Sequence, residues 1–342
     1  MADMIRAELR SRITFIVLAA VMVCAWLLAS QSTPNREEQA LWEQVRAAQL
    51  HLSDWRDSRG IGAAREDDPF NCGLIGREWS MLTTTLGSLE AKRTACDPAW
   101  AVRFARWYRE AGLQAGDTVA IYSSASFPAL LLSSQAAAES LGLDTLIIVS
   151  LGASTWGANH PDAPWPVLAK ELRRGGFLAK KADYYTLGGG SENGGGLASE
   201  AMDLLEQGAH SAGVELLRTN GLQPMIDAKS MLLLSRGARL LVSIGGSQAN
   251  LGDDPAVLEL EPGMLAPGLE ASAGNGVIAR ALDAGLPVLH LLNIRELAAR
   301  EGIVLDSAPG RVAPVAVNPW WSVIGLLLFF AVVLTHRRWR LL

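Results

Sequence analysis

The sequence has few of the residues that most often hold metals or form covalent cross-links. It contains only three cysteines and five histidines among 342 residues, and no spacing of the two is typical of a zinc site. It also lacks a complete P-loop and a complete dinucleotide fingerprint, which argues against ATP or NAD chemistry. We therefore expect neither a metal nor a cofactor.

Basic side chains are also scarce between the two ends. Between residues 1–12 and 336–342 the chain has 24 basic and 33 acidic side chains, a net charge of −9. Such a surface repels nucleic acids and other polyanions at long range. We expect no nucleic-acid partner, and an anionic ligand would need a local basic pocket.

Two long apolar runs are present, one near each end. Residues 13–29 hold no charge and follow three arginines, whereas residues 320–334 begin with two tryptophans and precede three arginines. Such runs are about long enough to span a bilayer, and short Arg-rich flanks stay in the cytoplasm. For the first run, a cleavable signal peptide is the alternative.

These patterns predict a two-pass protein of a bacterial inner membrane, with both termini cytoplasmic and a periplasmic domain between the helices. The predicted segments are a tail 1–12, a transmembrane helix 13–30, a juxtamembrane helix 31–57, an extracytoplasmic α/β domain 58–318 whose residues 58–96 form a capping segment, a transmembrane helix 319–335 and a tail 336–342. The juxtamembrane helix has one apolar face, which favours a stalk or a docking helix. That face consists of Leu41, Val45, Ala48 and Leu52.

Strand-like apolar runs alternate with helical ones in the exported region, which predicts an α/β fold with a mostly parallel sheet. The predicted strands are 118–122, 145–149, 183–187, 214–217, 240–244 and 287–291. The predicted helices are those beginning at Asp97 and the segments 127–141, 166–174, 197–211, 224–235, 276–284 and 294–300.

Segments rich in small and hydroxyl residues leave the carboxyl ends of four predicted strands. They are residues 123–126, 150–159, 188–196 and 245–250. Ligands bind at this edge of parallel sheets, and small residues let backbone N–H groups approach an anion closely. The pattern predicts a polar-ligand site, although short Gly/Ser turns are also ordinary connectors. The segment 188–196 equally fits a mobile lid.

Several longer motifs resemble the poly-γ-glutamate system protein family. They are residues 73–80, 83–94, 116–120, 126–130 and 152–159. The resemblance covers most of the ectodomain and both flanking helices. It implies an accessory membrane protein of poly-γ-glutamate synthesis or export, with the membrane subunits of the synthase, the anionic polymer and membrane lipid as partners.

Catalytic candidates are weak at this stage. Ser126 lies between a strand and a helix but lacks the glycines of a nucleophile elbow, so helix capping is its simpler role. His160 and Asp162 could form an acid–base pair, yet they equally fit a polar loop. The acidic pairs Asp67-Asp68 and Asp253-Asp254 could hold a divalent cation, although solvated loop acids are the simpler interpretation.

Lys92 and Arg93 form a basic pair that could grip a carboxylate, the alternative being an exposed helix end. The exported cysteines Cys72 and Cys96 either form a disulfide in the oxidising periplasm or stay free and buried. The candidate ligand-binding residues are Thr84, Thr85, Lys92, Arg93, Ser124, Ser126, Ser154, Thr155, Asn159, Gly189, Gly190, Gly245, Gly246 and Ser247.

Three functions remain compatible with the sequence. The leading hypothesis is a non-catalytic accessory protein that binds polymer or synthase subunits, without a covalent intermediate. The others are a periplasmic γ-glutamyl hydrolase or transferase and a membrane-tethered small-ligand sensor. The lack of a recognisable nucleophile–base pair disfavours the hydrolase, and the short tails disfavour the sensor.

Overall fold

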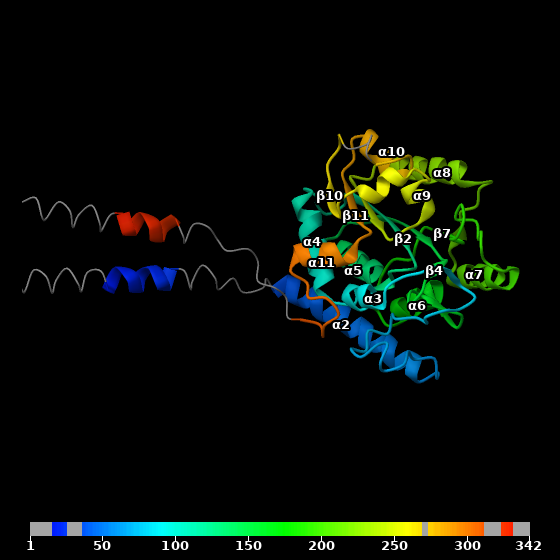
Figure 1. Ribbon diagram of the computed structural model, residues 1–342, viewed down its shortest axis with the longest axis horizontal. Coiled ribbons are helices and arrows are strands. Elements are labelled where there is room, and N and C mark those ends of the chain that lie inside the picture. The colour runs from blue at the N-terminus through cyan, green and yellow to red at the C-terminus, as the bar shows by residue number, and fades with distance from the viewer. Residues whose placement is uncertain (1–15, 26–35, 269–272, 311–322, 331–342) are drawn as a thin grey trace, which may run out of the picture. The chain divides into compact units, whose positions relative to one another are not determined.

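The computed structural model of the chain describes residues 16–25, 36–268, 273–310 and 323–330 (Figure 1). The chain falls into two compact units. The larger one is the unit Glu37–Val312, and the smaller one combines residues Met1–Arg36 with Ala313–Leu342. The predicted exported domain and the juxtamembrane helix thus fold as one body.

The described parts of the smaller unit, residues 16–25 and 323–330, are helical. Most of their apolar side chains are exposed, including Ile16, Val23 and Leu327. Among the described residues, no helix is both apolar enough and long enough to cross a membrane. The predicted tails and the rest of the two predicted spans lie outside the described residues.

A seven-stranded sheet forms the centre of the larger unit, in the order β10-β11-β9-β2-β3-β7-β8. Its strands are β2 (Thr118–Ser124), β3 (Asp144–Ser150), β7 (Tyr184–Thr186), β8 (Glu215–Leu216), β9 (Leu240–Ile244), β10 (Gly263–Leu265) and β11 (Val288–Leu291). All neighbours pair in parallel except β10 and β11. The predicted α/β fold with a mostly parallel sheet is confirmed.

The strand order reverses at β2. The chain runs from β2 through β3, β7 and β8 toward one edge, and β9 then returns to the other side of β2. In open α/β sheets, such a switch point leaves a crevice beyond the carboxyl ends of the two strands. A binding site is therefore expected where β2 and β9 end.

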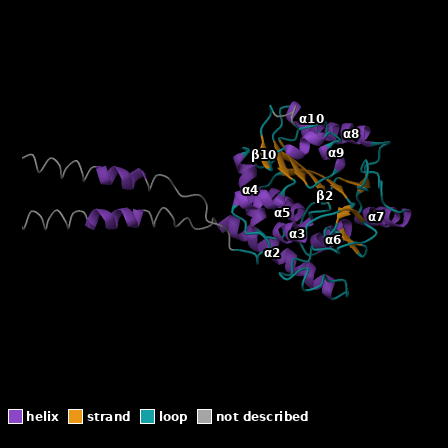
Figure 2. Ribbon diagram, in the orientation of Figure 1, coloured by secondary structure: helices purple, strands orange, loops and turns teal. Residues whose placement is uncertain are grey.

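Helices cover both faces of the sheet, as Figure 2 shows. Alternate residues of β2 point to opposite faces, so that Ile121 belongs to one apolar core and Tyr122 to the other. Helices that pack in the first core include α4 (Ala99–Glu110), α5 (Pro128–Ser140), α6 (Trp165–Arg174), α7 (Ser199–Ala212) and α11 (Ile294–Glu301). Those of the second core include α8 (Leu222–Ser235) and α10 (Val277–Asp283).

Helix α2 (Arg36–Asp57) is the predicted juxtamembrane helix, and it docks on the domain. Leu41, Val45, Ala48 and Leu52 on its apolar face are buried in the first core. Their spacing of three and four residues places them on one side of the helix, so the whole stripe is removed from water. Of the two roles predicted for this helix, a stalk or a docking helix, the burial of its apolar face agrees with docking.

The capping segment contains regular structure that the sequence did not predict. Strand β1 (Thr83–Thr85) pairs in parallel with β4 (Ala153–Ser154), and helix α3 (Leu89–Ala95) follows with Ser88 as its N-cap. The β1–β4 pairing joins the capping segment to the loop that leaves β3.

Other short elements outside the capping segment were not predicted either. The short strands β5 (Asn159–His160) and β6 (Ala163–Pro164) form a separate pair, and α9 (Gln248–Leu251) and a 3-10 helix (Pro255–Glu259) follow β9.

Strands β2 and β3 extend further than predicted. Their ladder continues as far as the pair Ser124 and Ser150, because parallel pairing of the two backbones is uninterrupted over seven residues. Ser123 and Ser124, predicted in a loop, therefore belong to the strand. The loop itself begins at Ala125.

Candidate functional site

A cavity of about 670 Å³ opens where β2, β3, β9 and β11 end. Most of its lining residues are small or carry a hydroxyl group, and none of them is acidic. The lining residues are Thr84, Thr85, Leu86, Gly87, Ser88, Ala91, Lys92, Ser124, Ser126, Phe127, Ser150, Gly152, Ser154, Gly189, Gly190, Gly195, Gly246, Ser247, Gln248, Leu251, Gly252, Leu292, Asn293, Ile294 and Arg295. The cavity lies at the strand edge where the sequence predicts a polar-ligand site.

Most of the candidate ligand-binding residues meet in this cavity. Those lining it are Thr84, Thr85, Lys92, Ser124, Ser126, Ser154, Gly189, Gly190, Gly246 and Ser247. Four candidates do not line it. Arg93, Thr155, Asn159 and Gly245 lie in the surrounding framework.

Lys92 extends from α3 into the cavity and is almost completely buried, with 3% of its surface exposed. Its ammonium group donates to the carbonyl oxygen of Ser126 and to Oγ of Ser154, at 2.8 Å from the latter. It also lies 3.5 Å from the ring centroid of Phe127. No acidic side chain among the described residues contacts it. Burial therefore lowers the pKa of Lys92 from its ordinary value to about 7.

Three serines form a hydrogen-bonded chain next to Lys92, through the side chains of Ser124 and Ser126 and the backbone N–H of Ser154. Ser124 Oγ donates to Ser126 Oγ at 2.8 Å, and the N–H of Ser154 donates to the same Ser126 oxygen at 2.9 Å. These serines come from the end of β2 and from β4. The chain fixes Ser154 beside the amine of Lys92.

Ser126 does not cap the helix that follows it. The N-cap of α5 is Phe127, whose side chain offers no hydrogen bond, and Pro128 takes the first helical turn. The hydroxyl of Ser126 is held instead by Ser124 and Ser154. The capping role expected from the sequence is therefore wrong, because the Ser126 hydroxyl is engaged by the side chain of Ser124 in β2 and by the backbone N–H of Ser154 in β4.

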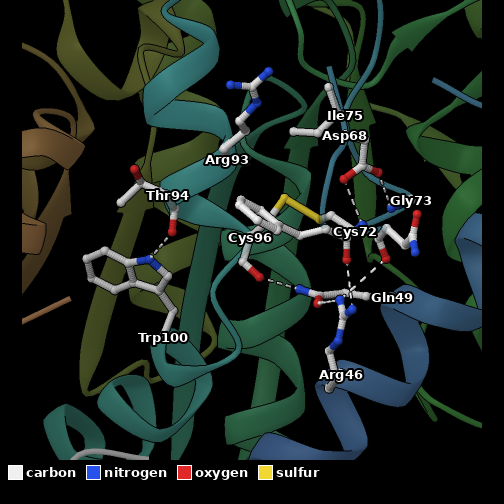
Figure 3. Close-up of a disulfide and its surroundings, with 12 residues drawn as sticks. Arg46, Gln49, Asp68, Cys72, Gly73, Ile75, Arg93, Thr94, Cys96 and Trp100 are labelled. Atoms are coloured by element: carbon white, nitrogen blue, oxygen red, sulfur yellow. Dashed lines mark hydrogen bonds between the residues drawn. A yellow bond between two sulfur atoms is a disulfide. The ribbon is translucent and has the colours of Figure 1, made fainter. Parts of the chain in front are cut away.

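The structure separates Lys92 from Arg93. The Arg93 guanidinium pairs with Asp306 at 3.1 Å and donates to the carbonyl oxygens of Asp67 and Glu66. Successive helical residues point about 100° apart, so both could not face the same cavity. Arg93 thus ties α3 to the rest of the capping segment and to Asp306, and Figure 3 shows its side chain extending away from the disulfide.

Thr155 and Asn159 also act as framework residues. Thr155 Oγ1 exchanges hydrogen bonds with the N–H and the carbonyl oxygen of Gly87, at 2.6 and 2.8 Å. The Asn159 side chain holds the backbone of Arg77 and the hydroxyl of Thr83. Both link the loop after β3 to the capping segment, and so they position the wall that contains Ser154.

Gly87 is required where this wall meets Ser154. A Cβ atom built on Gly87 would lie 2.8 Å from Ser154 Oγ and 3.2 Å from Cε of Lys92. Both distances are shorter than ordinary contacts, so a larger residue would displace the two side chains. The glycine permits a close approach of backbone to the Lys92–Ser154 contact.

The glycine-rich segment 188–196 is anchored by a buried ion pair. Glu192 and Lys229 are each 1% exposed, with Nζ 2.9 Å from Oε1. Thr186, Ser247 and the N–H of Ala249 also donate to the Glu192 carboxylate. Burial alone would raise the pKa of Glu192, but Lys229 and these hydroxyls outweigh it and lower the value.

Two residues of this loop, Ser191 and Glu192, have a strained backbone conformation, and the ion pair of Glu192 with Lys229 helps to keep the loop in that conformation. Ser191 and Glu192 have φ angles of 54° and 56°, which non-glycine residues rarely adopt. Gln248 accepts from the N–H of Ser191 at 2.6 Å. The loop therefore presents Gly189 and Gly190 to the cavity from a fixed support rather than from a free lid.

The rim near α11 was not predicted. Asn293, Ile294 and Arg295 line the cavity where β11 ends and α11 begins, and the Arg295 guanidinium pairs with Glu90 at 2.6 Å. Only four strand-end loops were predicted, because the connection after β11 is short and has no glycine. Asn293 before an amphipathic helix was the available signal, since its side chain accepts from the N–H of Glu296 as an N-cap.

The other catalytic candidates lie outside the cavity. Nδ1 of His160 accepts from the N–H of Asp162, and the exposed Asp162 carboxylate is 3.9 Å from it. Burial lowers the pKa of His160, and the charges of Arg77 and Arg56 reinforce this. The pair therefore closes a turn.

The two acidic pairs are engaged locally as well. The Asp68 carboxylate accepts from the N–H groups of Cys72 and Gly73. Asp254 caps the 3-10 helix, and Asp253 accepts from Asn275. The carboxylates of Asp68, Asp253 and Asp254 therefore each have a structural partner.

The capping segment carries a disulfide between Cys72 and Cys96, whose Cα atoms are 6.0 Å apart (Figure 3). Cys96 is the C-cap of α3, the helix that contributes Lys92. The Gln49 amide of α2 donates to the carbonyl oxygen of Cys96 at 2.6 Å. The disulfide and α2 thus hold α3, and hence Lys92, against the domain.

Comparison of the chain with models of protein families, with curated proteins and with solved structures gives no match. The chemistry of the cavity is therefore the main indication of what the domain does.

Proposed function

We propose that this protein is a membrane-tethered accessory of poly-γ-glutamate synthesis or export, and that its cavity binds a carboxylate-bearing segment of the polymer. The observation that most supports this proposal is that Lys92 places a buried ammonium group in the cavity, with no acidic partner among the described residues. A buried charge without a counter-ion is unfavourable, and an anionic ligand would offset that cost. The protein's other buried lysine, Lys229, already has such a partner in Glu192.

The remaining lining supports an anionic ligand. Arg295 is 66% exposed at the rim, and its pairing with Glu90 leaves further guanidinium N–H donors for a carboxylate. Hydroxyls and glycine backbone supply the other polar groups. In a domain with an acidic balance, a lining with two cations and no acid forms the local basic pocket that a polyanion requires.

Membrane tethering rests on the sequence of the two apolar runs. The disulfide supports export, because such bonds persist in oxidising compartments. The motif resemblance supports the identity of the polymer and of the synthase subunits as partners. A γ-glutamyl chain carries one free carboxylate per residue, which suits a cavity with two cationic groups.

Calorimetric titration of the full chain in detergent with a γ-linked glutamate oligomer tests the proposal. Lys92→Met and Arg295→Ala should each weaken binding by about tenfold, the effect of losing roughly 1.4 kcal/mol. Arg239→Ala is the matched control, because Arg239 pairs with Asp117 and does not line the cavity. An oligomer whose carboxylates are amidated should bind weakly, and equal binding of the two oligomers would refute a carboxylate site.

A second candidate, γ-glutamyl hydrolysis or transfer, is favoured by one specific observation. The Lys92 amine contacts the hydroxyl of Ser154 at 2.8 Å within the same cavity. Nucleophile–base pairs of acyl-transfer enzymes have this separation.

A further inference from the structure

We propose that Ser154 is a nucleophile and Lys92 its general base, so that the cavity cleaves or transfers the amide bond of a bound γ-glutamyl chain. This inference rests on the proposed function, because it uses the same cavity and the same class of ligand. It extends that function from binding to chemistry. The one motif-based objection, the missing nucleophile elbow, concerns Ser126 and not Ser154.

The contact has the geometry that the chemistry needs. Ser154 Oγ and Lys92 Nζ are 2.8 Å apart, within the range for direct proton transfer. Ser154 is the only hydroxyl that the amine contacts among the described residues. Serine–lysine pairs serve as nucleophile and base in acyl-transfer enzymes of unrelated folds.

A third group orients the base. The carbonyl oxygen of Ser126 accepts one N–H of Lys92, and the Phe127 ring closes another side of the amine. A neutral amine can donate to this carbonyl and still direct its lone pair at the Ser154 hydroxyl. The hydrogen bond between Lys92 and Ser154 then runs in the reverse direction, with serine as the donor.

The surroundings of Lys92 favour its neutral form. Contacts to the amine come from the Ser126 carbonyl, the Ser154 hydroxyl and the Phe127 ring, and none of these carries a charge. Burial lowers the pKa of Lys92 to about 7, which suits a general base at neutral pH. Near pH 7 both forms of Lys92 are populated: the protonated amine helps to hold a ligand carboxylate, whereas the neutral amine accepts the Ser154 proton while Arg295 at the rim holds the carboxylate.

Ser126 is a positioning residue and not the nucleophile. Its Oγ accepts from both Ser124 and the N–H of Ser154, and it reaches Lys92 only through its backbone carbonyl. Its hydroxyl therefore holds the wall on which Ser154 lies. Gly87 completes this wall by leaving room for Ser154 Oγ.

The reaction balances without a cofactor. Ser154 Oγ attacks the amide carbonyl carbon while its proton moves to Lys92. The C–N bond then breaks, the leaving amine takes the proton from Lys92, and the acyl group remains as an ester on Ser154. Water then attacks the ester carbon while Lys92 takes its proton, the bond from carbon to Ser154 Oγ breaks, and Ser154 recovers the proton from Lys92 as a free carboxylic acid leaves. Attack by an amine in place of water follows the same steps and gives a new amide.

The full chain in detergent is incubated with a γ-linked glutamate oligomer of defined length, and chain lengths and the intact protein mass are measured. We expect altered oligomer lengths and an acyl adduct on Ser154. Ser154→Ala should lower the rate at least about a hundredfold while retaining oligomer affinity within about threefold. Ser133→Ala, which removes another buried hydroxyl outside the cavity, is the matched control and should keep the rate.

A fluorophosphonate probe separates the chemistry from the choice of substrate. Labelling should map to Ser154, rise with pH through about 7 as Lys92 loses its proton, and disappear in Lys92→Met. If the wild type binds the oligomer but forms no adduct and takes no label, the catalytic inference fails and the binding function stands. If Ser154 is labelled but no oligomer binds, the γ-glutamyl ligand is wrong and with it both proposals as stated. An unchanged rate in Ser154→Ala also overturns the inference.

Discussion

Lys92 and Lys229 are buried lysines in opposite electrostatic situations. Lys229 contacts the Glu192 carboxylate, Ser247 and Asn250, so its charge is compensated. Lys92 contacts only neutral groups among the described residues. The compensated Lys229 stabilises the fold, whereas the uncompensated Lys92 lowers the free energy of unfolding and lies at the cavity. This contrast gives two substitutions with opposite expected signs.

Lys92→Met should stabilise the protein at neutral pH. An unfolded lysine is protonated below about 10.5 and the folded one below about 7, so between these values the unfolded state binds more protons and stability rises with pH. The cost of burying the amine is therefore largest below pH 7, at most about 5 kcal/mol. Chemical denaturation at pH 7 and pH 10 should show a gain for the variant that shrinks at the higher pH. A variant that is less stable at both pH values would contradict the assignment of Lys92 as uncompensated.

Lys229→Met should instead destabilise the protein by roughly 3–5 kcal/mol, because it leaves the Glu192 carboxylate buried without a counter-ion. Replacing Lys229 with Met and Glu192 with Gln together should recover part of this loss. The free energies of unfolding of the two single variants and the double variant form the measurement. If the single and double variants lose equal stability, the ion pair is not what holds the glycine-rich loop.

Single residues differ in how far the sequence reveals them. Ser154 and the loop glycines were predicted to bind ligand because they follow strand ends, whereas Lys92 was predicted to do so as part of a basic pair that could grip a carboxylate. The pairing of Glu192 with Lys229 was not, because 37 residues separate them and only the folded sheet brings their segments together. Lys92 and Arg93 were treated as one basic pair, and the helical turn of α3 gives them different neighbours.

At the scale of elements, the alternation of apolar runs was sufficient to predict the main strands and helices. Strand β9 begins and ends where the sequence predicted it, at Leu240 and Ile244. The missed strands β1 and β4 are only two or three residues long. Their existence depends on pairing between segments about 70 residues apart, which no local pattern contains.

The disulfide should matter for the cavity as well as for the fold, because Cys96 ends the helix that carries Lys92. Closing a loop of 24 residues stabilises a protein by about 3 kcal/mol in the chain-entropy account. Cys72→Ala combined with Cys96→Ala should lower the free energy of unfolding by an amount of that order and weaken oligomer binding. Denaturation and titration with and without reductant provide the measurement. Reductant should leave the double variant unchanged, and an unaffected affinity in that variant would show that α3 is held without the bond.

At the scale of the whole molecule, charge is distributed unevenly. Three arginines precede the first apolar run and three follow the second, whereas the region between them has an acidic balance. A polymer of carboxylates is repelled by most of such a surface and attracted only where cations gather. The cavity with Lys92 and Arg295 is such a place, so the charge pattern favours capture of one chain segment over coating by the polymer.

The arrangement of the chain across the membrane can be tested with reporter fusions. Because Arg-rich flanks stay in the cytoplasm, we expect both termini to lie there and the domain outside. A phosphatase active only in the periplasm should give no signal when fused after Leu342. The same reporter fused after Gly310, before the second apolar run, is the matched control and should be active. Strong phosphatase activity in the full-length fusion would place the C-terminus outside and overturn the two-pass arrangement, whereas an inactive Gly310 fusion would place the cavity in the cytoplasm, away from an exported polymer.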